Sequence, residues 1–448
     1  MIYYQEPFVT LYQGHALDVL RELPPESVDC VLCSPPYWGL RSYKTEPIVW
    51  DNHSGCEHEW GDTIKRGRAG WEATPEGQKQ YKPAESDAYQ SQSNFCLKCH
   101  GWKGELGLEP TIELYISHLL QVFDEVKRIL KKTGTCWVNI GDSYYGGGFG
   151  YEKDLSAEEF AKKYPKQGSN AGTCMDWKER KMVGDTKRGN LLPAKSLCLI
   201  PERFALGMVE RGWILRNRIV WYKSNPMPES VKDRFTGTYE DVFFFTKSRK
   251  YWFEQQFEPH LEESLERYQH GFHRDKIAGD GYVMADAYTK VYGNPLGRNK
   301  RDVWEINTQP YPEAHFATFP EDLCKTPILS GCPAMICKKC GKARERIYER
   351  GDYQRHETEA FHLATHGQGA NRSKHSPPLE VTDKGYSDCG CGAGWEPGVL
   401  LDPFCGSGTA LAVAKSLGRK AIGIDVNRKY CDLCVKRISK VSIPMPLL

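Results

Sequence analysis

Apolar positions along the chain predict strands that alternate with helices. The clearest helix is the amphipathic segment at 115–130, which leads into a basic last turn at Lys131 and a glycine stop at Gly134. Alternation of this kind favours a parallel α/β sheet. In chain order, the predicted elements are strand 8–12, helix 16–23, strand 28–32, helix 115–130, strand 135–140, helix 201–210, strands 214–222, 241–246 and 399–401, helix 410–417, strand 420–424 and helix 428–441.

The long segments between these elements show little periodicity. Residues 41–107 and 332–397 combine close cysteine pairs with many glycines, and neither segment has the apolar pattern of a core of its own. The segment near 145–192 is polar, glycine-rich and basic, which predicts a flexible loop. We therefore expect one α/β domain that is interrupted by inserted modules.

The overall composition limits the class of protein and its compartment. The chain has 448 residues, of which 40% are hydrophobic and 26% charged, as in a globular protein. Its net charge of +2 neither favours nor excludes nucleic acid, because binding depends on a local basic face. The first residues lack the basic start and apolar run of a signal peptide, and no stretch approaches the roughly 18 apolar residues of a membrane span. We therefore expect a cytoplasmic protein with no membrane partner.

A glycine-rich turn after the strand at 399–401 predicts a nucleoside site. Residues 402–409 read Asp-Pro-Phe-Cys-Gly-Ser-Gly-Thr, and glycines let a ligand approach the backbone closely. Asp425 ends the next predicted strand, where an acid in doubly wound folds binds the ribose hydroxyls. The glycine and lysine fingerprints of phosphate sites are absent, which favours a nucleoside without a pyrophosphate, and S-adenosylmethionine is the common one. The alternative is a purely structural glycine turn.

The segment Ser34-Pro35-Pro36-Tyr37 follows the apolar strand at 28–32. Two consecutive prolines force a rigid extended turn without backbone donors. The serine hydroxyl and a free carbonyl can together accept both hydrogens of an amino group and direct its lone pair at an electrophile. Tyr37 offers a flat face for stacking a base. The alternative is an ordinary Pro-Pro turn.

Together, these motifs resemble those of the amino-methylating DNA methyltransferases, a family with bacterial and phage members specific for N4-cytosine or N6-adenine. Residues 33–38, Cys-Ser-Pro-Pro-Tyr-Trp, look like the family's catalytic motif, and residues 402–409 look like its cofactor motif. The catalytic motif comes first, as in the beta group, in which the target recognition region lies between the two motifs. The resemblance implies a Rossmann-like S-adenosylmethionine-dependent methyltransferase fold that is circularly permuted.

Further segments agree with this resemblance, namely 138–144, 221–228 and 315–323. The strand at 10–14 is expected to follow Asp425 in space and to complete the adenine pocket. Two positions depart from the family: His15 replaces a common aspartate, so this position offers the cofactor no carboxylate, and Cys33 replaces the usual threonine.

The resemblance assigns roles to individual residues of this sequence. The implied catalytic residues are Ser34, Pro35, Pro36 and Tyr37. The implied cofactor-binding residues are Asp402, Phe404, Gly406, Ser407, Gly408, Thr409, Asp425, Phe319, Pro320 and His15.

The implied chemistry is direct attack of an exocyclic amine on the activated methyl group, so that positioning of the reactants is the main source of rate. No cysteine nucleophile is needed, and the target base must leave the duplex. In this family, Ser at the position of Ser34 usually accompanies N4-cytosine, whereas Asp accompanies N6-adenine. We therefore expect an N4-cytosine enzyme, with an N6-adenine enzyme as the alternative. An RNA or small-molecule methyltransferase and a non-catalytic zinc nucleic-acid-binding protein are further alternatives.

Close-spaced cysteines predict two structural zinc sites. The chain has 17 cysteines, and in a cytosolic protein grouped cysteines indicate metal rather than disulfides. Four ligands without an open position are typical of structural zinc, and metal would supply the folding energy that these poorly patterned insertions lack. His100 is an alternative to His58, and unliganded cysteines are the alternative for both sets. The predicted ligands are Cys56, His58, Cys96 and Cys99 in the first set, and Cys337, Cys340, Cys389 and Cys391 in the second.

Three basic segments are candidate contacts to double-stranded DNA, at 162–188, 267–301 and 338–350. The resemblance also allows a homodimer and a cognate restriction enzyme as partners, in the cytoplasm of a bacterium or a phage-infected cell. The expected organisation is catalytic parts at 1–40, 108–253 with the basic loop near 145–192, 313–331 and 398–448, zinc-binding insertions at 41–107 and 332–397, and a target recognition region at 254–312.

Overall fold

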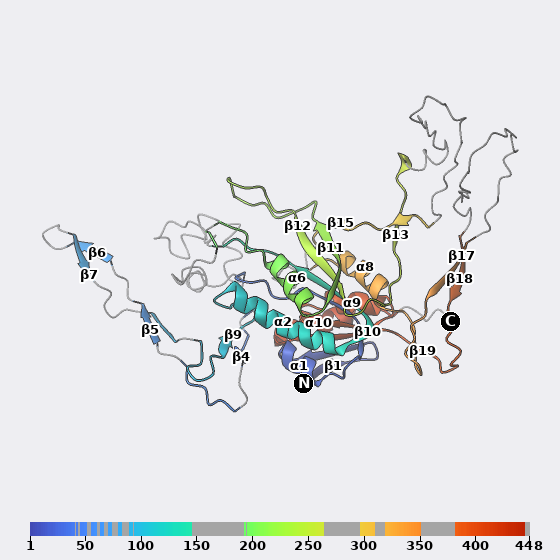
Figure 1. Ribbon diagram of the computed structural model, residues 1–448, viewed down its shortest axis with the longest axis horizontal. Coiled ribbons are helices and arrows are strands. Elements are labelled where there is room, and N and C mark those ends of the chain that lie inside the picture. Colours follow the sequence, from blue (N-terminus) through green and yellow to red (C-terminus); the bar gives the residue numbers. More distant parts are fainter. Residues whose placement is uncertain are drawn as a thin grey trace, which may run out of the picture.

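A nine-stranded mixed sheet forms the centre of the protein in the computed structural model (Figure 1). In spatial order its strands are β1 (Ile2–Gln5), β2 (Val9–Gln13), β21 (Lys420–Asp425), β20 (Val399–Asp402), β3 (Val28–Cys33), β10 (Leu130–Ile140), β12 (Tyr239–Thr246), β11 (Ile214–Tyr222) and β15 (Val303–Glu305). The structure describes residues 1–443 except 41, 44, 52–54, 61–62, 67–69, 74–78, 83–88, 93, 146–191, 194, 264–295, 310–318 and 351–380.

The sheet is mixed, so the expectation of a parallel sheet holds for its five central strands only. The five strands from β2 to β10 run parallel, but β1 is antiparallel to β2, and β12 is antiparallel to both of its neighbours. Strands β11 and β12 are consecutive in the chain and pair directly with each other, from Ile214 beside Thr246 to Tyr222 beside Tyr239. No helix lies between them, and consecutive strands joined without a crossover run antiparallel.

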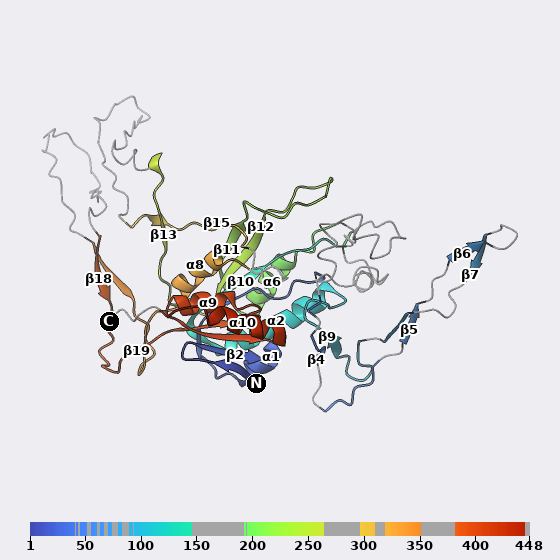
Figure 2. The same ribbon diagram turned by 180° about the vertical axis from the view of Figure 1, so that it is seen from behind.

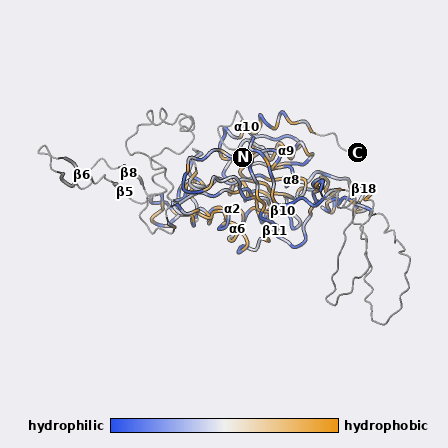
Figure 3. The backbone as a smooth tube through the Cα atoms, turned by 90° about the horizontal axis from the view of Figure 1, so that it is seen from above, coloured by the Kyte–Doolittle hydropathy of each residue, from blue (hydrophilic) through white to orange (hydrophobic). Residues whose placement is uncertain are grey.

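Helices cover both faces of the sheet. One core cluster contains buried side chains of α1 (Ala16–Glu22), α2 (Ile112–Ile129) and α6 (Ile200–Glu210). A second cluster, on the other face, contains those of α8 (Glu321–Gly331), α9 (Thr409–Ser416) and α10 (Arg428–Ile438). Figure 2 views the molecule from behind and shows the second group of helices. Figure 3 shows apolar segments gathered in this central body. These two layers are those of a Rossmann-like fold.

Helix α2 ends earlier than the sequence pattern predicts. Thr111 caps its N-terminus by accepting a hydrogen bond from the amide of Leu114 at 3.2 Å. At the other end Leu130 turns into extended backbone and pairs with Val28, so the basic residues after it belong to β10. Gly134 is therefore not a helix stop: a Cβ there would lie 2.9 Å from the carbonyl oxygen of Asp29, and the glycine allows close approach of β3.

Short two-stranded ladders lie outside the main sheet, in the two predicted insertions and in the predicted target recognition region. The predicted elements did not include them, nor β1, β15 or α8. The ladders are formed by β4 (Ile48–Trp50) with β9 (Trp102–Gly104), β5 (Thr63–Arg66) with β8 (Tyr89–Gln92), β6 (Gly70–Ala73) with β7 (Lys79–Lys82), β13 (Phe257–Glu258) with β14 (Arg298–Asn299), β16 (Ile336–Cys337) with β19 (Trp395–Glu396), and β17 (Arg346–Arg350) with β18 (Val381–Tyr386).

Candidate active site and metal-binding clusters

The two motifs that lie far apart in the sequence meet at one edge of the sheet. Ser34 follows the carboxyl end of β3, and the glycine-rich turn follows the carboxyl end of β20. The two strands are parallel neighbours, with Leu401 beside Val31. Helix α2, which follows β3, and helix α9, which follows β20, contribute to cores on opposite faces. The ends of β3 and β20 therefore flank a topological switch point, which is where ligands bind in such sheets.

The glycine-rich turn has the backbone conformation that glycine favours. Gly406 and Gly408 have φ values of +50° and +77°. A Cβ on Gly408 would lie 2.4 Å from Sγ of Cys434 in α10, whereas a Cβ on Gly406 would meet nothing within 4 Å. Gly408 thus packs against protein at the start of α9, and Gly406 leaves space beside the backbone.

Two carboxylates stand at this turn. Asp425 accepts hydrogen bonds from the amides of Gly406 at 2.9 Å and Asn427 at 2.7 Å. Asp402 accepts one from the amide of Phe404 at 3.0 Å. Burial raises the pKa of Asp402 to about 8 and the pKa of Asp425 to about 6, against these hydrogen bonds. The turn therefore holds two carboxyl groups whose protonated forms are favoured by burial.

The hydroxyl groups of the turn differ in their partners. Ser407 is buried, and its hydroxyl finds no hydrogen-bond partner among the described residues. Thr409 instead accepts a hydrogen bond from the Arg437 guanidinium of α10. A buried polar group without a partner is costly in a folded protein. The Ser407 hydroxyl is thus suited to a polar ligand at the turn, whereas Thr409 is engaged in holding two helices together.

The N-terminal strand lies where the sequence predicts it. Strand β2 runs parallel to β21 with Gln13 beside Asp425, and the amide of Gly14 donates to the Asp425 carbonyl oxygen at 3.0 Å. The ring of His15 packs edge-on against Trp50, with centroids 4.8 Å apart. Burial lowers the pKa of His15 to about 4, so the imidazole is neutral at physiological pH.

Phe319 and Pro320 precede α8, and Pro320 is its N-cap residue. Phe319 is partly buried against the core formed with α9 and α10. Cys324 lies four residues after Pro320. Burial raises the pKa of its thiol well above 9, and the Asp402 carboxylate contributes to that shift. The start of α8 therefore packs into the same buried cluster as Leu400 of β20 and Cys405 of the turn. The neighbouring His315 lies outside the described residues.

A network of polar side chains holds the catalytic motif. The Tyr37 hydroxyl lies 2.7 Å from Oε2 of Glu240 and 3.2 Å from Oδ1 of Asn139. Glu240 is also paired with Lys223. A Cβ on Gly141 would lie 2.5 Å from the Tyr37 ring, so this glycine makes room for the phenol. These contacts fix Tyr37 from β10 and β12, and Lys223, which follows β11, pairs with Glu240.

Burial of the same motif sets the protonation state of Tyr37, and a side chain of α2 holds the backbone at Pro36. Burial, and secondarily the Glu240 charge, raises the pKa of Tyr37 well above 10, while a hydrogen bond from Ser34 acts in the opposite direction. Tyr37 is therefore a neutral phenol that cannot serve as a base. The Tyr115 hydroxyl of α2 donates to the Pro36 carbonyl oxygen at 2.8 Å. That bond uses one of the two lone pairs of the Pro36 carbonyl oxygen, so the carbonyls of Ser34 and Pro35 are the less engaged candidate acceptors for an amine.

Several residues of this network were not predicted as site residues. Asn139 and Lys223 lie in segments that resemble the family, and this resemblance is the feature of the sequence that could have identified them. Tyr115 sits on the apolar face of α2 and reads as core. Glu240 is one acid among many, and no pattern in the sequence distinguishes it.

The structure gathers each of the two predicted ligand sets. The ligand atoms of Cys56, His58, Cys96 and Cys99 lie within 4.8 Å of one another, and so do those of Cys337, Cys340, Cys389 and Cys391. In the first set, Nδ1 of His58 is 3.5 Å from Sγ of Cys99. His58, and not His100, thus lies in the first cluster.

Both clusters are built on the same backbone turn. The amide of His100 donates to the Cys96 carbonyl oxygen and the amide of Gly341 to that of Cys337, each at 2.9 Å. In both clusters the chain then folds back in the same way. The amides of Cys96 and Cys337 donate to the carbonyl oxygens of the residues five positions later, Gly101 and Lys342. His100 and Gly341 both have positive φ, at 61° and 70°. His100 therefore occupies the turn position that Gly341 occupies in the second cluster.

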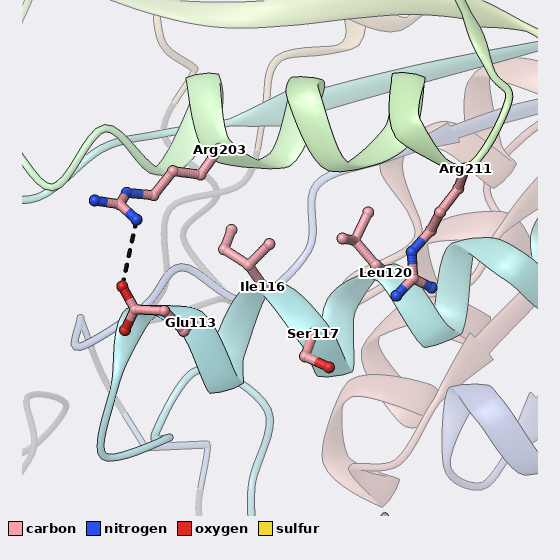
Figure 4. Close-up of a pocket in the computed structure, with 6 residues that line it drawn as sticks. All are labelled: Glu113, Ile116, Ser117, Leu120, Arg203 and Arg211. Carbon is pink, nitrogen blue, oxygen red and sulfur yellow. Dashed lines mark hydrogen bonds and ion pairs between the residues drawn. The ribbon is translucent and has the colours of Figure 1, made fainter.

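A surface groove lies between α2 and α6 (Figure 4). Arg203 and Glu113 form an ion pair in it at 3.3 Å. None of the site residues predicted from the sequence lines the groove, and it is not the candidate site. The groove is lined by Glu113, Ile116, Ser117, Leu120, Arg203 and Arg211.

In the described part of the chain, no helix combines the length and apolarity of a membrane span.

Comparison with known proteins places the chain in a family. The model described as DNA methylase, of the N6/N4 methyltransferases, matches residues 28–334 and 396–436. Type II methyltransferase M.Cfr9I of Citrobacter freundii is 29% identical over 429 residues, covering 96% of this chain and 87% of its own. Type II methyltransferase M.SmaI of Serratia marcescens is 27% identical over 425 residues, covering 95% and 89%. A solved structure of PvuII DNA methyltransferase (cytosine-N4-specific) covers 98% of this chain and 90% of its own, with 13% identity and a TM-score of 0.45. The chain belongs to the DNA methylase family of N6/N4 amino-methyltransferases.

Proposed function

We propose that this protein transfers the methyl group of S-adenosylmethionine to the N4 amine of a cytosine flipped out of double-stranded DNA. The observation that carries the proposal is the meeting of Ser34, at the end of β3, with the glycine-rich turn at the end of the neighbouring β20. An amine acceptor and a nucleoside-type site then face the same switch point. The reaction class follows from the family.

The residues of the turn fit S-adenosylmethionine. Asp425 offers carboxylate oxygens to ribose hydroxyls, Ser407 offers an unpartnered buried hydroxyl, and Gly406 leaves open space beside its backbone. When bound, the cofactor supplies a methyl group already activated by its sulfonium. Phe404 and Asp402 complete the turn, Phe319 and Pro320 lie close to it at the start of α8, and Gly408 and Thr409 join it to α9.

The catalytic motif acts by orientation rather than by covalent chemistry. Ser34 and the proline-flanked carbonyls accept the two amine hydrogens, which leaves the nitrogen lone pair for the methyl group. Pro35 and Pro36 keep this turn rigid, and Tyr37, held by Glu240, presents a fixed ring to the base. As the nitrogen–carbon bond forms, the carbon–sulfur bond of the sulfonium would break and leave S-adenosylhomocysteine, and the amine nitrogen would lose one proton to solvent.

Cytosine is favoured over adenine by Ser34 alone. N6-adenine is the alternative, because both exocyclic amines present the same hydrogens to the same acceptors. The deciding experiment is incubation of the protein with a labelled methyl donor and duplex DNA, followed by mass spectrometry of the nucleosides. N4-methylcytosine is the expected product, and N6-methyladenine would overturn the choice of base.

The same assay separates the other readings. Ser34→Ala is expected to abolish most of the transfer while leaving cofactor binding intact, and full activity of this variant would end the catalytic assignment. Transfer to single-stranded or structured RNA but not to DNA would favour an RNA methyltransferase. A wild-type chain that binds DNA but not S-adenosylmethionine would be a non-catalytic binding protein.

The order of the motifs supports a circularly permuted member of the fold, the beta group. The cofactor strand β20 follows the catalytic strand β3 by more than 360 residues, yet the two strands pair. On this arrangement residues 254–312 are the target recognition region, and most of them lie outside the described residues. The basic loop near 145–192 lies outside them as well.

Two structural zinc ions complete the proposal, one in each cysteine cluster. Three thiolates and one imidazole, or four thiolates, with all ligand atoms within 4.8 Å, fit a closed tetrahedral site. Metal analysis of the purified protein is expected to give about two zinc per chain. Replacement of Cys99 or Cys389 by serine should remove about one zinc each, and a metal-free wild-type protein would overturn both sites.

The relatives suggest a biological setting. The type II methyltransferase names of M.Cfr9I and M.SmaI support a role beside a cognate restriction enzyme in a bacterial or phage-infected cytoplasm. Protection of DNA from one type II nuclease after treatment with this enzyme would identify the recognition sequence. Size-exclusion chromatography with light scattering decides between a monomer and a homodimer.

A further inference from the structure

One carboxylate organises the chain that follows the catalytic motif. Glu105 accepts hydrogen bonds from the amides of Tyr43 and Thr45, each at 3.0 Å, and from the hydroxyl of Ser42 at 3.2 and 3.3 Å. A carboxylate with donors on both oxygens fixes a short segment firmly, because such charge-assisted bonds are stronger than neutral ones. We call the three residues Ser42, Tyr43 and Thr45 the strap.

The strap reaches the acid of the candidate cofactor site. The side-chain amide of Asn427 donates to the Tyr43 carbonyl oxygen at 3.2 Å, and the backbone amide of the same Asn427 donates to Asp425 at 2.7 Å. The Tyr43 ring packs edge-on against Tyr430 of α10, with centroids 6.3 Å apart.

These contacts require the strap to cross the cofactor turn. In the sheet, β20 lies between β3, which the strap follows, and β21, which Asn427 follows. A segment that starts from the end of β3 and contacts the end of β21 must pass the carboxyl end of β20. That end carries the glycine-rich turn, with Gly406 and its open space.

The carboxylate that holds the strap is itself anchored by the first insertion. Glu105 follows β9, which pairs with β4, and Trp50 of β4 stacks on His118 of α2 at 4.6 Å. His118 is fully buried and bridges two acids, with Nε2 3.1 Å from Asp51 and Nδ1 3.0 Å from Glu109. The insertion thus packs on α2 through buried aromatic and polar contacts.

We infer that Glu105 is a positioning residue that holds the strap closed over bound S-adenosylmethionine, so that the first insertion sets the affinity for the cofactor. The inference rests on the proposed function of the turn as the cofactor site. It predicts a role in binding rather than in transfer, because the hydrogen bonds of Glu105 within the described part of the chain go to the strap. The ligand is the nucleoside part of the cofactor, which the strap covers.

The test is binding of S-adenosylhomocysteine by equilibrium dialysis or calorimetry, which needs no methyl transfer. Glu105→Gln keeps the shape but weakens the acceptor, and we expect about a tenfold higher Kd, the equivalent of about 1.4 kcal/mol. Ser42→Ala removes one donor and should raise the Kd about two- to threefold. Glu46→Gln is the matched control, because Glu46 is an exposed acid in the next position after the strap.

Steady-state kinetics separate positioning from a general loss of structure. In Glu105→Gln, the KM for S-adenosylmethionine should rise with the Kd, while kcat at saturating cofactor and the KM for DNA stay near wild type. The melting temperature of the cofactor-free variant should match that of Glu46→Gln. Unchanged S-adenosylhomocysteine binding in Glu105→Gln, or a fall in kcat alone, would overturn the inference. A wild-type protein that does not bind S-adenosylhomocysteine would instead overturn the proposed function.

Discussion

At the scale of single residues, the glycine-rich turn, our proposed cofactor site, combines burial with acidic side chains. Asp402 and Asp425 remain partly protonated at pH values where exposed acids are ionised, with pKa values of about 8 and about 6. The two acids therefore couple both folding and ligand binding to pH, in opposite directions. A carboxylate costs stability when it ionises in a buried place, but the ionised form is the better acceptor for ribose hydroxyls.

The larger stability effect belongs to Asp402, whose pKa is raised further than that of Asp425. Because its folded pKa is raised above the unfolded value, the native state holds an extra proton between about pH 4 and pH 8, and its contribution to stability is lost as pH rises through that window. Asp402→Asn should therefore raise the free energy of unfolding relative to wild type at pH 8 to 9, by at least about 1 kcal/mol, and less at pH 5. Urea unfolding at both pH values measures this, and an equal change at both would contradict it.

The binding effect belongs to Asp425. As pH rises through about 6, this carboxyl ionises, and we expect the Kd for S-adenosylhomocysteine to fall between pH 5 and pH 7. Asp425→Asn cannot titrate, so its weaker binding should be flat over the same range. Calorimetry at several pH values provides the measurement. A wild-type profile as flat as that of the asparagine variant would exclude Asp425 as the ribose acceptor.

At the scale of elements, the two glycines of the turn have different roles: Gly408 allows α9 and α10 to pack closely, and Gly406 leaves space beside the backbone. Both have positive φ, but only Gly408 has a protein neighbour, Cys434, at 2.4 Å from an added Cβ. Gly408→Ala must push α10 away from α9 and should cost about 2 to 3 kcal/mol of stability. Gly406→Ala carries only backbone strain of about 1 kcal/mol, yet it fills the open space at the turn.

The two alanine variants should therefore separate folding from binding. We expect Gly406→Ala to melt close to wild type and to bind S-adenosylhomocysteine at least about tenfold more weakly, since its methyl group enters the cofactor space. Gly408→Ala should show the larger drop in melting temperature. Calorimetric scans with and without ligand measure both effects. Normal ligand binding by Gly406→Ala would mean that the cofactor does not approach this glycine.

Local pattern predicted most of the elements and both site motifs, because short apolar runs and amphipathic helices are written in neighbouring residues. It was less informative where distant contacts decide. Helix α2 ends at Ile129 because Leu130 pairs with Val28, a strand about a hundred residues away. Strand β12 is antiparallel because it pairs with the strand directly before it. Glu240 and Glu105 carry no local signal, since only the fold brings them to Tyr37 and Tyr43.

At the scale of the whole molecule, the two cysteine-rich insertions contact opposite ends of the central strands. The first follows the carboxyl end of β3 and returns to the catalytic motif, where the Gly39 amide donates to the Gly107 carbonyl oxygen at 2.8 Å. The second precedes β20 at its amino end, where the Gly398 amide donates to the Pro333 carbonyl oxygen at 3.0 Å. Figure 1 shows β4 and β9 on one side of the sheet and β17 to β19 on the other.

This arrangement predicts that losing one metal site differs from losing the other. Cys99→Ser should loosen the insertion that anchors Glu105, and so raise the Kd for S-adenosylhomocysteine several-fold. Cys389→Ser should leave that Kd near wild type, because its cluster borders the amino ends of the strands and not the cofactor turn. Both variants should lose about one zinc and some thermal stability, since metal binding contributes to folding. Zinc content, melting temperature and S-adenosylhomocysteine affinity of the two purified variants give the comparison. Equal loss of cofactor affinity in both would show that the insertions act through global stability, whereas a selective loss in Cys99→Ser ties the first metal site to the closing of the strap.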